Sequence, residues 1–225
     1  MIETALLYIF AYLVGSVPTA YLIGKLAKGI DIRKYGSGNV GGSNLVSHVG
    51  KWSLVPLGLF EVFIKGALPV LIGQHLLGLE RASTQLLIAP LLAIAGHNWP
   101  VFLKFQGGRG VAVLSGTLLA LAPLLLAAFV VVFVAGWLVT RSSGVWVLVS
   151  LGLLPVWAII IGEPSMISWY CIGALTLVVL KRLLSNCGPF PQEVPRKKVL
   201  FNRLFRDRDV DDRADWIWRV PGRTK

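Results

Sequence analysis

Two glycine-rich polar segments have residue types that suit the binding of an anion. We name residues 36–44 loop one and residues 104–110 loop two. Glycine lacks a Cβ, so backbone N–H groups can close around a phosphate, and a helix that follows such a loop directs its positive dipole end to the same place. The two loops therefore predict a site for a phosphorylated substrate.

Loop one offers neutral donors and acceptors and contains no carboxylate. Its candidate substrate-binding residues are Gly36, Gly38, Asn39, Gly41 and Asn44, and Ser37 is a candidate catalytic residue. Neither loop has the G-x-x-x-x-G-K-[ST] spacing of a Walker-type phosphate loop. A polar turn at a membrane surface remains the alternative interpretation of loop one.

Loop two combines a cation with glycines at the start of an apolar stretch. Its candidate substrate-binding residues are Gly107, Gly108, Arg109 and Gly110. His97 lies about two helical turns before Lys104, and both are candidate catalytic residues. A histidine near a helix end is also commonly a satisfied polar residue, and this alternative stays open.

The chemistry that the sequence lacks is also informative. We find no Asp, Glu and His cluster with metal-ligand spacing, no serine elbow and no pair of carboxylates. A reaction here would depend on positioning and charge stabilisation of an activated substrate, for which an acyl group with a phosphate leaving group is suitable. We predict no metal and no cofactor. Glu61 and Lys65 form either a structural ion pair or part of a polar cavity.

The composition defines the environment of these residues. Of the 225 residues, 55% are hydrophobic and 15% charged, and the mean hydropathy is +0.71. These values predict an integral membrane protein of the all-α class. We expect residues 1–186 to form one transmembrane domain and residues 187–225 a basic, Pro-containing cytoplasmic tail.

Six apolar stretches follow one another along the chain, at Thr4–Leu26, Trp52–Leu79, Ser83–Leu103, Val111–Val139, Gly144–Ile161 and Met166–Leu180. The fourth would be about 43 Å long as one helix, against a hydrocarbon core of roughly 30 Å. Because Pro123 lies within it, we predict a break there and about seven membrane segments. The distribution of Lys and Arg then places the N-terminus outside, and both loops and the C-terminus in the cytoplasm.

The end of the chain is strongly basic. From Lys181 to Lys225 it has twelve Lys and Arg against six Asp and Glu, a formal net charge of +6. A basic segment next to a membrane attracts anionic lipid headgroups, which we expect as partners. Since the tail has no nucleic-acid-binding motif, we expect no nucleic acid partner.

The motifs resemble those of the bacterial acyl-phosphate:glycerol-3-phosphate acyltransferases, the PlsY family. The matching segments are Gly15–Pro18, Asp31–Lys34, Gly36–Asn39, Lys65–Gly66, Leu68–Val70, Gly96–His97, Pro100–Phe102 and Phe105–Ala112. The resemblance implies a seven-helix enzyme of the bacterial inner membrane that moves an acyl group from acyl phosphate to the sn-1 hydroxyl of glycerol 3-phosphate. Lysophosphatidic acid and inorganic phosphate would be its products, without metal or coenzyme A.

The same resemblance implies roles for the candidate residues. Ser37 and Asn39 with the backbone of loop one would hold one phosphate, and residues 107–110 would hold another, with His97 and Lys104 beside them. The attacking hydroxyl would lose its proton to the phosphate of the acyl phosphate or to His97, and we favour the phosphate.

This chain departs from the family pattern at several positions. Ser47 stands where the family has an arginine, and the lysine pair of the second motif is Gln106 and Arg109. The family's third motif, H-R-x-N-I-x-R, has no clear equivalent after Leu180, where Lys181, Arg182 and Asn186 stand instead. Two alternatives therefore remain, a catalytically silent lipid-binding paralogue and an anion or phosphate transporter.

Overall fold

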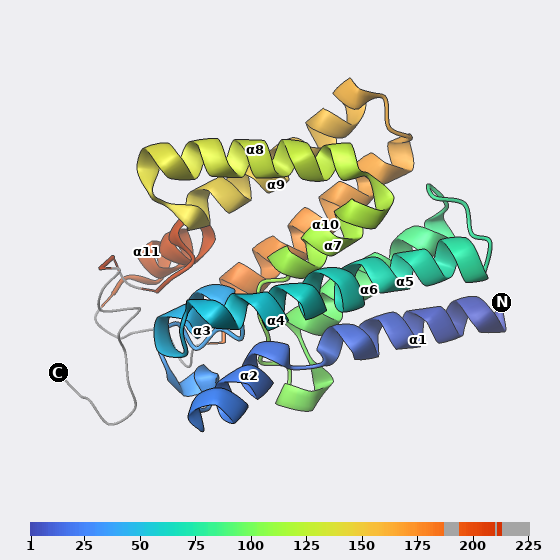
Figure 1. Cartoon of the computed structure of the whole chain (residues 1–225). Coiled ribbons are helices and arrows are strands. Elements are labelled where there is room, and N and C mark those ends of the chain that lie inside the picture. Colours follow the sequence, from blue (N-terminus) through green and yellow to red (C-terminus); the bar gives the residue numbers. More distant parts are fainter. Residues whose placement is uncertain (187–193, 210, 213–225) are drawn as a thin grey trace.

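The computed structural model describes residues 1–186, 194–209 and 211–212. Every regular element within these ranges is a helix, and the helices form a bundle (Figure 1). Six helices of the described part are long and apolar enough to cross a bilayer, at Ile2–Lys28, Lys51–Leu76, Thr84–Leu103, Pro123–Thr140, Ser143–Ile161 and Ser165–Leu184. The predicted all-α membrane bundle is confirmed.

Several of these spans are built from consecutive shorter helices. The first contains α1 (Ile2–Ser16) and α2 (Thr19–Lys28), which meet at Val17 and Pro18. The second contains η2 (Lys51–Ser53), α4 (Leu54–Gly58), η3 (Leu59–Ala67), α5 (Leu68–Leu71) and η4 (Ile72–Leu76). The third contains α6 (Thr84–Asn98) and η5 (Val101–Leu103). Between the first two spans lie η1 (Ile32–Lys34) and α3 (Gly42–His48).

The predicted break at Pro123 is present. Helix α7 (Val111–Leu121) ends before Ala122, whose φ of −153° and ψ of 76° interrupt the helix, and α8 (Pro123–Thr140) begins at the proline. A proline at the first helical position loses no hydrogen bond, because that N–H has no partner inside the helix. The Leu121 carbonyl at the break accepts a hydrogen bond of 2.8 Å from Arg81. With 11 residues, α7 is the short segment beside the six long ones.

The segments alternate in direction along the bundle (Figure 1). After α8 come α9 (Ser143–Ile161) and α10 (Ser165–Leu184), followed by α11 (Arg196–Phe201) and η6 (Asn202–Arg206). As a result, α3, the start of α7, the end of α10 and α11 lie toward one end of the bundle, and the start of α1 lies at the other. We name the former the loop end. Its location in the cytoplasm stays a prediction.

Two pairs of glycines let the helices that carry the polar residues approach their neighbours closely. A Cβ on Gly66 would meet the carbonyl oxygen of Val113 in α7, and one on Gly116 of α7 would meet the carbonyl oxygen of Val62. Such close backbone approach is a common way for membrane helices to pack, because lipid gives them little hydrophobic reason to associate. Gly15 of α1 and Gly96 of α6 make the corresponding contact between those two helices. Lys65 and His97, each next to one of these glycines, are therefore held at defined positions.

Loop one has a small hydrophobic core of its own. The side chains that form it are Ala20, Ile32, Val40, Leu45, Val49, Leu57 and Leu103. They come from α2, η1, α3, α4 and η5, so this cluster fixes loop one against the first three spans. The larger core lies among α1, α5, α6, α7, α8, α9 and α10.

Candidate active site

Loop one is held in shape by its own side chains. The amide nitrogen of Asn44, a buried residue, lies 3.0 Å from the Ile32 carbonyl, 3.0 Å from the Tyr35 carbonyl and 3.1 Å from the Asn39 carbonyl. The Ser37 hydroxyl accepts a hydrogen bond of 3.2 Å from the Asn39 N–H. Asn44, predicted to bind substrate, thus uses its amide nitrogen to hold the loop backbone.

The entry to loop one is fixed by an ion pair. Arg33 donates to Asp31 at 2.9 Å and 2.7 Å through two guanidinium nitrogens, and its guanidinium lies 5.3 Å from the centre of the Tyr21 ring. The hydrogen bonds from Arg33 lower the pKa of the Asp31 carboxyl below its usual value. The positive charge of Arg33 is therefore partly compensated before it can act on a substrate.

Loop two packs directly on the end of α6. The Gly108 N–H donates to the His97 carbonyl at 3.0 Å, and a Cβ on Gly108 would meet both His97 Nε2 and, at 2.7 Å, the Val40 carbonyl oxygen. Lys104 and Phe105 have φ values of 51° and 65°, which turn the chain sharply after η5. Only glycine fits at position 108, and its backbone brings loop two against both His97 and loop one.

The end of α10 connects the two loops. Asn186 donates from its amide nitrogen to the Gly107 carbonyl at 2.5 Å and to the Gly38 carbonyl at 3.3 Å. Its amide oxygen accepts a hydrogen bond of 2.8 Å from Lys181, which also lies 5.5 Å from the centre of the Trp99 ring. Asn186 therefore joins loop one to loop two at the position where the third family motif is missing.

A buried polar triad lies beneath the loops. His97 Nδ1 is 2.6 Å from one carboxylate oxygen of Glu61, and Lys65 Nζ is 2.8 Å from the other. Glu61 and Lys65 are each 1% exposed and His97 is 9% exposed. Lys65 compensates the charge of Glu61, and Glu61 fixes the orientation of the imidazole, so that His97 Nε2 faces Gly108. Of the two interpretations left open for Glu61 and Lys65, each holds in part, because the ion pair also lines a pocket.

Both loops open onto a single cavity of about 790 Å³. Its polar wall consists of Ser37, Asn39, Gly41, Gly42, Ser43, Asn44, Ser47, Glu61, His97, Arg109 and Gly110, with Ser143, Gly144, Arg182, Arg206, Asp207 and Arg208. Its apolar wall consists of Val46, Leu54, Leu57, Val111, Ala112, Phe133 and Val147. The start of α7 faces this cavity, where its dipole favours an anion.

A second, much smaller pocket of about 10 Å³ lies next to the triad. Glu61, Lys65, His97, Gly107 and Gly108 line it. Glu61 and His97 line both spaces, so these two residues connect the triad with the large cavity.

Not every candidate residue lies at the cavity. Lys104 is exposed and lines neither space, and its left-handed backbone turns the chain there. Gly36 lies outside both linings, and Gly38 takes part through its carbonyl contact with Asn186. The structure therefore brings the predicted residues of the two loops together with His97, and leaves Lys104 apart from them.

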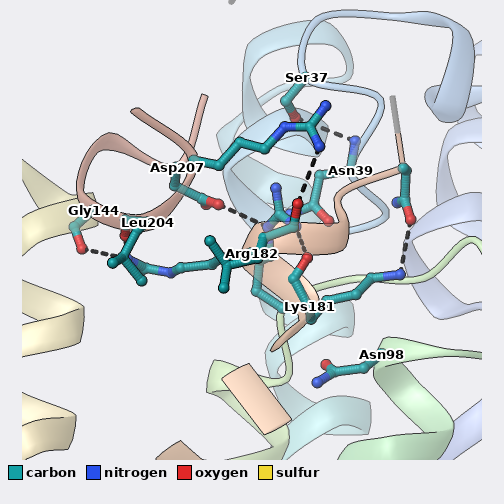
Figure 2. A network of polar contacts seen from close by, with 12 residues as sticks. Ser37, Asn39, Asn98, Gly144, Lys181, Arg182, Leu204 and Asp207 are labelled. Carbon is teal, nitrogen blue, oxygen red and sulfur yellow. Dashed lines mark hydrogen bonds and ion pairs between the residues drawn. The ribbon is translucent and has the colours of Figure 1, made fainter. Parts of the chain in front are cut away.

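Arg109 uses its guanidinium within the protein. It donates from one nitrogen to the Lys181 carbonyl at 2.7 Å, and its Nε lies 2.7 Å from an Asp207 carboxylate oxygen. Figure 2 shows that Lys181 and Arg182 reach in opposite directions from the end of α10, with Arg182 directed toward Gly144 and Leu204. Arg182 donates to both of those carbonyls, at 2.8 Å and 2.7 Å.

Three cavity residues, Arg206, Asp207 and Arg208, were not candidates from the sequence. Arg206 is the last residue of η6 and the other two follow it, in the part of the chain expected to form a tail. No motif marks them, and the basic composition of the region was their only signal. The division into domains at residue 186 stays a prediction, but η6 packs against α9 and α10, and residues 206–208 form part of the cavity wall.

The fold and the cavity define a class, the multi-pass helical membrane proteins with a glycine-lined polar cavity at one end of the bundle. The family model described as "Glycerol-3-phosphate acyltransferase" matches residues 5–188. The chain belongs to this family, as the resemblance of its motifs to PlsY predicted.

Known relatives agree with this assignment over most of the chain. Glycerol-3-phosphate acyltransferase 4 of Dehalococcoides mccartyi (strain CBDB1) is 39% identical over 215 residues, covering 92% of this chain and 90% of the relative. Glycerol-3-phosphate acyltransferase 2 of Moorella thermoacetica (strain ATCC 39073 / JCM 9320) is 43% identical over 157 residues, covering 69% and 78%. These names favour the enzymatic interpretation over a silent paralogue or a transporter.

Solved structures of PlsY, an integral membrane glycerol 3-phosphate acyltransferase, have the same fold. Its glycerol 3-phosphate form superposes with a TM-score of 0.74 at 31% sequence identity, covering 80% of this chain and 88% of that one. Its lysophosphatidic acid form superposes with a TM-score of 0.72 at 30% identity, with the same coverage.

Proposed function

We propose that the protein transfers an acyl group from acyl phosphate to the sn-1 hydroxyl of glycerol 3-phosphate, giving lysophosphatidic acid and inorganic phosphate. One observation carries the proposal: both glycine loops and His97 open onto the same cavity of about 790 Å³. That volume lies within the range of small-molecule sites, and backbone N–H groups and arginines on its polar wall suit phosphorylated ligands.

The reaction needs little chemistry from the protein. The sn-1 hydroxyl oxygen attacks the acyl carbon, a new ester C–O bond forms, and the C–O bond to the phosphate breaks. The hydroxyl proton goes to the departing phosphate, so charge and atoms balance without another reactant. Glycine-loop amides and the start of α7 stabilise negative charge that develops on the leaving phosphate.

His97 then acts on the substrate through Nε2. Because Glu61 lies 2.6 Å from Nδ1, the imidazole is oriented with Nε2 toward Gly108 and the cavity. In this position Nε2 hydrogen-bonds a phosphate or hydroxyl of the substrate and aligns it for attack. Glu61 acts as a positioning residue, and Lys65 forms a buried ion pair with it.

The test is an assay of the purified protein in detergent with acyl phosphate and glycerol 3-phosphate. We expect release of inorganic phosphate and formation of lysophosphatidic acid in equal amounts, unchanged by EDTA. Strict dependence on a metal, or on acyl-coenzyme A as donor, would overturn the mechanism. Phosphate release in the absence of an acceptor would indicate hydrolysis instead of transfer.

His97→Ala tests the role of the imidazole. We expect kcat to fall by about 10²–10⁴-fold, the range typical for a positioned acid or base. The matched control is His75→Ala, since His75 is exposed in η4, near the end of the second span and outside the cavity. Equal activities of the two variants would show that His97 has no role in the reaction.

We further propose that the protein resides in the bacterial inner membrane, with the loop end in the cytoplasm and in contact with anionic lipids. The cluster of cations around loop one and the basic end of the chain support this orientation. A Lys104→Cys variant in a Cys187→Ser background should react with an impermeant maleimide only after the membrane is opened. Labelling of this variant in intact cells would indicate the opposite topology.

A further inference from the structure

The segment after the last span folds back onto the loop end. We name residues 196–208 the cap segment; it contains α11 and η6 and lies beyond residue 188, where the family match ends. Val199 is fully buried and Asn202 is 1% exposed. The cap segment is therefore packed as part of the bundle.

Arginine contacts with backbone carbonyls fix the cap segment to α10. Arg182 donates to the Leu204 carbonyl at 2.7 Å, and Arg203 donates to the Leu183 carbonyl at 3.0 Å. Arg203 also forms a buried ion pair of 2.6 Å with Asp209. These contacts hold η6 against the end of α10 and so determine where the residues after η6 lie.

Those residues point into the substrate cavity. Asp207 and Arg208 line it together with both glycine loops. Asp207 has a φ of 56°, in the left-handed region that aspartate adopts more readily than most residues. Its carboxylate reaches Arg109 of loop two, and the Asp207 side chain is 28% exposed while that of Arg109 is 8% exposed. Figure 2 shows Asp207 beside Arg182, with Ser37 and Asn39 nearby.

This contact places a carboxylate on the arginine that sequence reasoning assigned to phosphate binding. Arg109 also donates a hydrogen bond to the Lys181 carbonyl, which carries no formal charge. A phosphate monoester carries nearly two negative charges at neutral pH, against one on a carboxylate. A phosphorylated substrate in this cavity therefore competes with Asp207 for Arg109 and is favoured by the greater charge.

We propose that the cap segment is part of the substrate site, with Arg208 binding the phosphate group of a substrate and Asp207 occupying Arg109 until that phosphate replaces it. The inference rests on the proposed function. The phosphate belongs either to glycerol 3-phosphate or to the acyl phosphate, and the assay distinguishes the two. The cap supplies a cation close to where the family's third motif is missing.

Two neighbouring substitutions should act in opposite directions. Arg208→Gln should raise the KM for one phosphorylated substrate by about tenfold, the loss expected for one charge-assisted hydrogen bond. Asp207→Asn should lower the same KM by several-fold, because it removes the competing charge while keeping the size of the side chain. We expect kcat to change less than KM in both. Damage to the fold would instead impair binding in both variants.

The matched control is Lys198→Gln. Lys198 belongs to the same segment, its side chain is 54% exposed, it pairs with Asp211 and it lies outside the cavity lining. Lys198→Gln removes one positive charge, as Arg208→Gln does, so an effect of overall charge would appear in both variants. If Asp207→Asn does not fold, Asp207→Gly removes the carboxylate and adopts the φ of 56° without strain.

The concentration of each substrate is varied while the other is saturating. The substrate whose KM changes is the one whose phosphate binds Arg208. A second measurement needs no turnover: the shift in thermal unfolding on adding glycerol 3-phosphate or inorganic phosphate in detergent should be smaller for Arg208→Gln and larger for Asp207→Asn. An inactive wild-type protein would refute the proposed function. The shifts in unfolding temperature would then still test the role of the cap segment. Unchanged KM values and unchanged shifts, or weaker binding by Asp207→Asn, would overturn the cap proposal.

Discussion

Loop one and loop two have similar glycine-rich compositions but are held in different ways. Loop one is stabilised from within, by the Asn44 amide against three carbonyls of its own neighbourhood. Loop two is held from outside, by His97 of α6 and by Asn186 after α10. A glycine-rich pattern therefore identifies backbone that can approach a ligand, whereas the residues that hold this backbone determine how a mutation will act.

This difference has a consequence for the cavity. Loop one is expected to keep its shape when α7 or α10 shifts, because its Asn44 contacts are local and its small core draws on the first three spans. Loop two depends on the relative positions of α6, α7 and α10. Changes that separate those helices should therefore affect catalysis before they affect loop one.

Among substitutions within the two loops, Gly108→Ala in loop two should have the largest effect. The new Cβ would meet His97 Nε2 and the Val40 carbonyl oxygen, neither of which can move without displacing the site. We expect kcat/KM to fall at least about 100-fold, the loss associated with roughly 1 Å of misplacement. Steady-state kinetics and the thermal unfolding temperature, measured together, separate this effect from loss of the fold.

Gly41→Ala in loop one is the matched comparison. Gly41 has an extended backbone with φ of −151°, and an added Cβ would first contact the flexible Asn39 amide at 3.2 Å. Its effect on kcat/KM should stay below about tenfold, or ~1.4 kcal/mol. If Gly41→Ala is as damaging as Gly108→Ala, the distinction between the loops is wrong.

Asn44→Ala should have the second largest effect, and it should act on stability. Removing the amide leaves the Ile32, Tyr35 and Asn39 carbonyls without this donor, at a cost of about 1–3 kcal/mol. We expect a lower thermal unfolding temperature, by about 2–4 °C per kcal/mol. Asn44→Asp should be at least as destabilising, because it presents a carboxylate to those carbonyls; a stable Asp variant would contradict the observed contacts.

Asn186→Ala should be milder, and it should act on activity. Loss of its contacts with Gly107 and Gly38 loosens loop two relative to loop one. We expect kcat/KM to fall about tenfold, in line with one hydrogen bond of about 1.4 kcal/mol. The unfolding temperature should change less than in Asn44→Ala. A larger loss of stability than in Asn44→Ala would reverse the comparison.

Asp31→Asn should have the smallest effect, a small loss of stability near neutral pH that disappears in acid. The hydrogen bonds from Arg33 lower the pKa of Asp31 in the folded protein, so the pair stabilises the fold above the unfolded pKa of about 3.8, and this contribution is lost as the pH falls through the lower folded value. The thermal unfolding temperature of the wild type should therefore fall more than that of Asp31→Asn as the pH falls below about 4. Identical pH profiles would show that the pair contributes nothing to loop one.

The sequence was sufficient for features that depend on length, composition and alternation. The length of the 111–139 stretch and Pro123 predicted the break that the structure shows. Alternating segments predicted that the two loops meet at one end, and the shared cavity confirms that they do. The pairing of Glu61 with His97 was not predicted, because it depends on how the second span and α6 are rotated against each other.

The side-chain roles within the loops were harder to predict. An asparagine amide has the same sequence signal whether it faces a ligand or its own backbone, and Asn44 does the latter. Lys104 has the charge expected of a phosphate ligand, but the left-handed turn at this residue leaves it outside the cavity. Asp207 and Arg208 were missed because nothing in a basic, Pro-containing segment indicates that it returns to the site.

The apolar wall of the cavity bears on the selection of donors. Leu54 and Leu57 of α4, Phe133 of α8 and Val147 of α9 line the space, so that the reacting carbonyl can lie among polar groups while its hydrocarbon lies against these apolar side chains. We expect the end of the acyl chain to lie in the lipid, where no protein wall limits its length. We therefore expect similar turnover for short and long saturated donors, with the surrounding membrane acting as the remainder of the binding site.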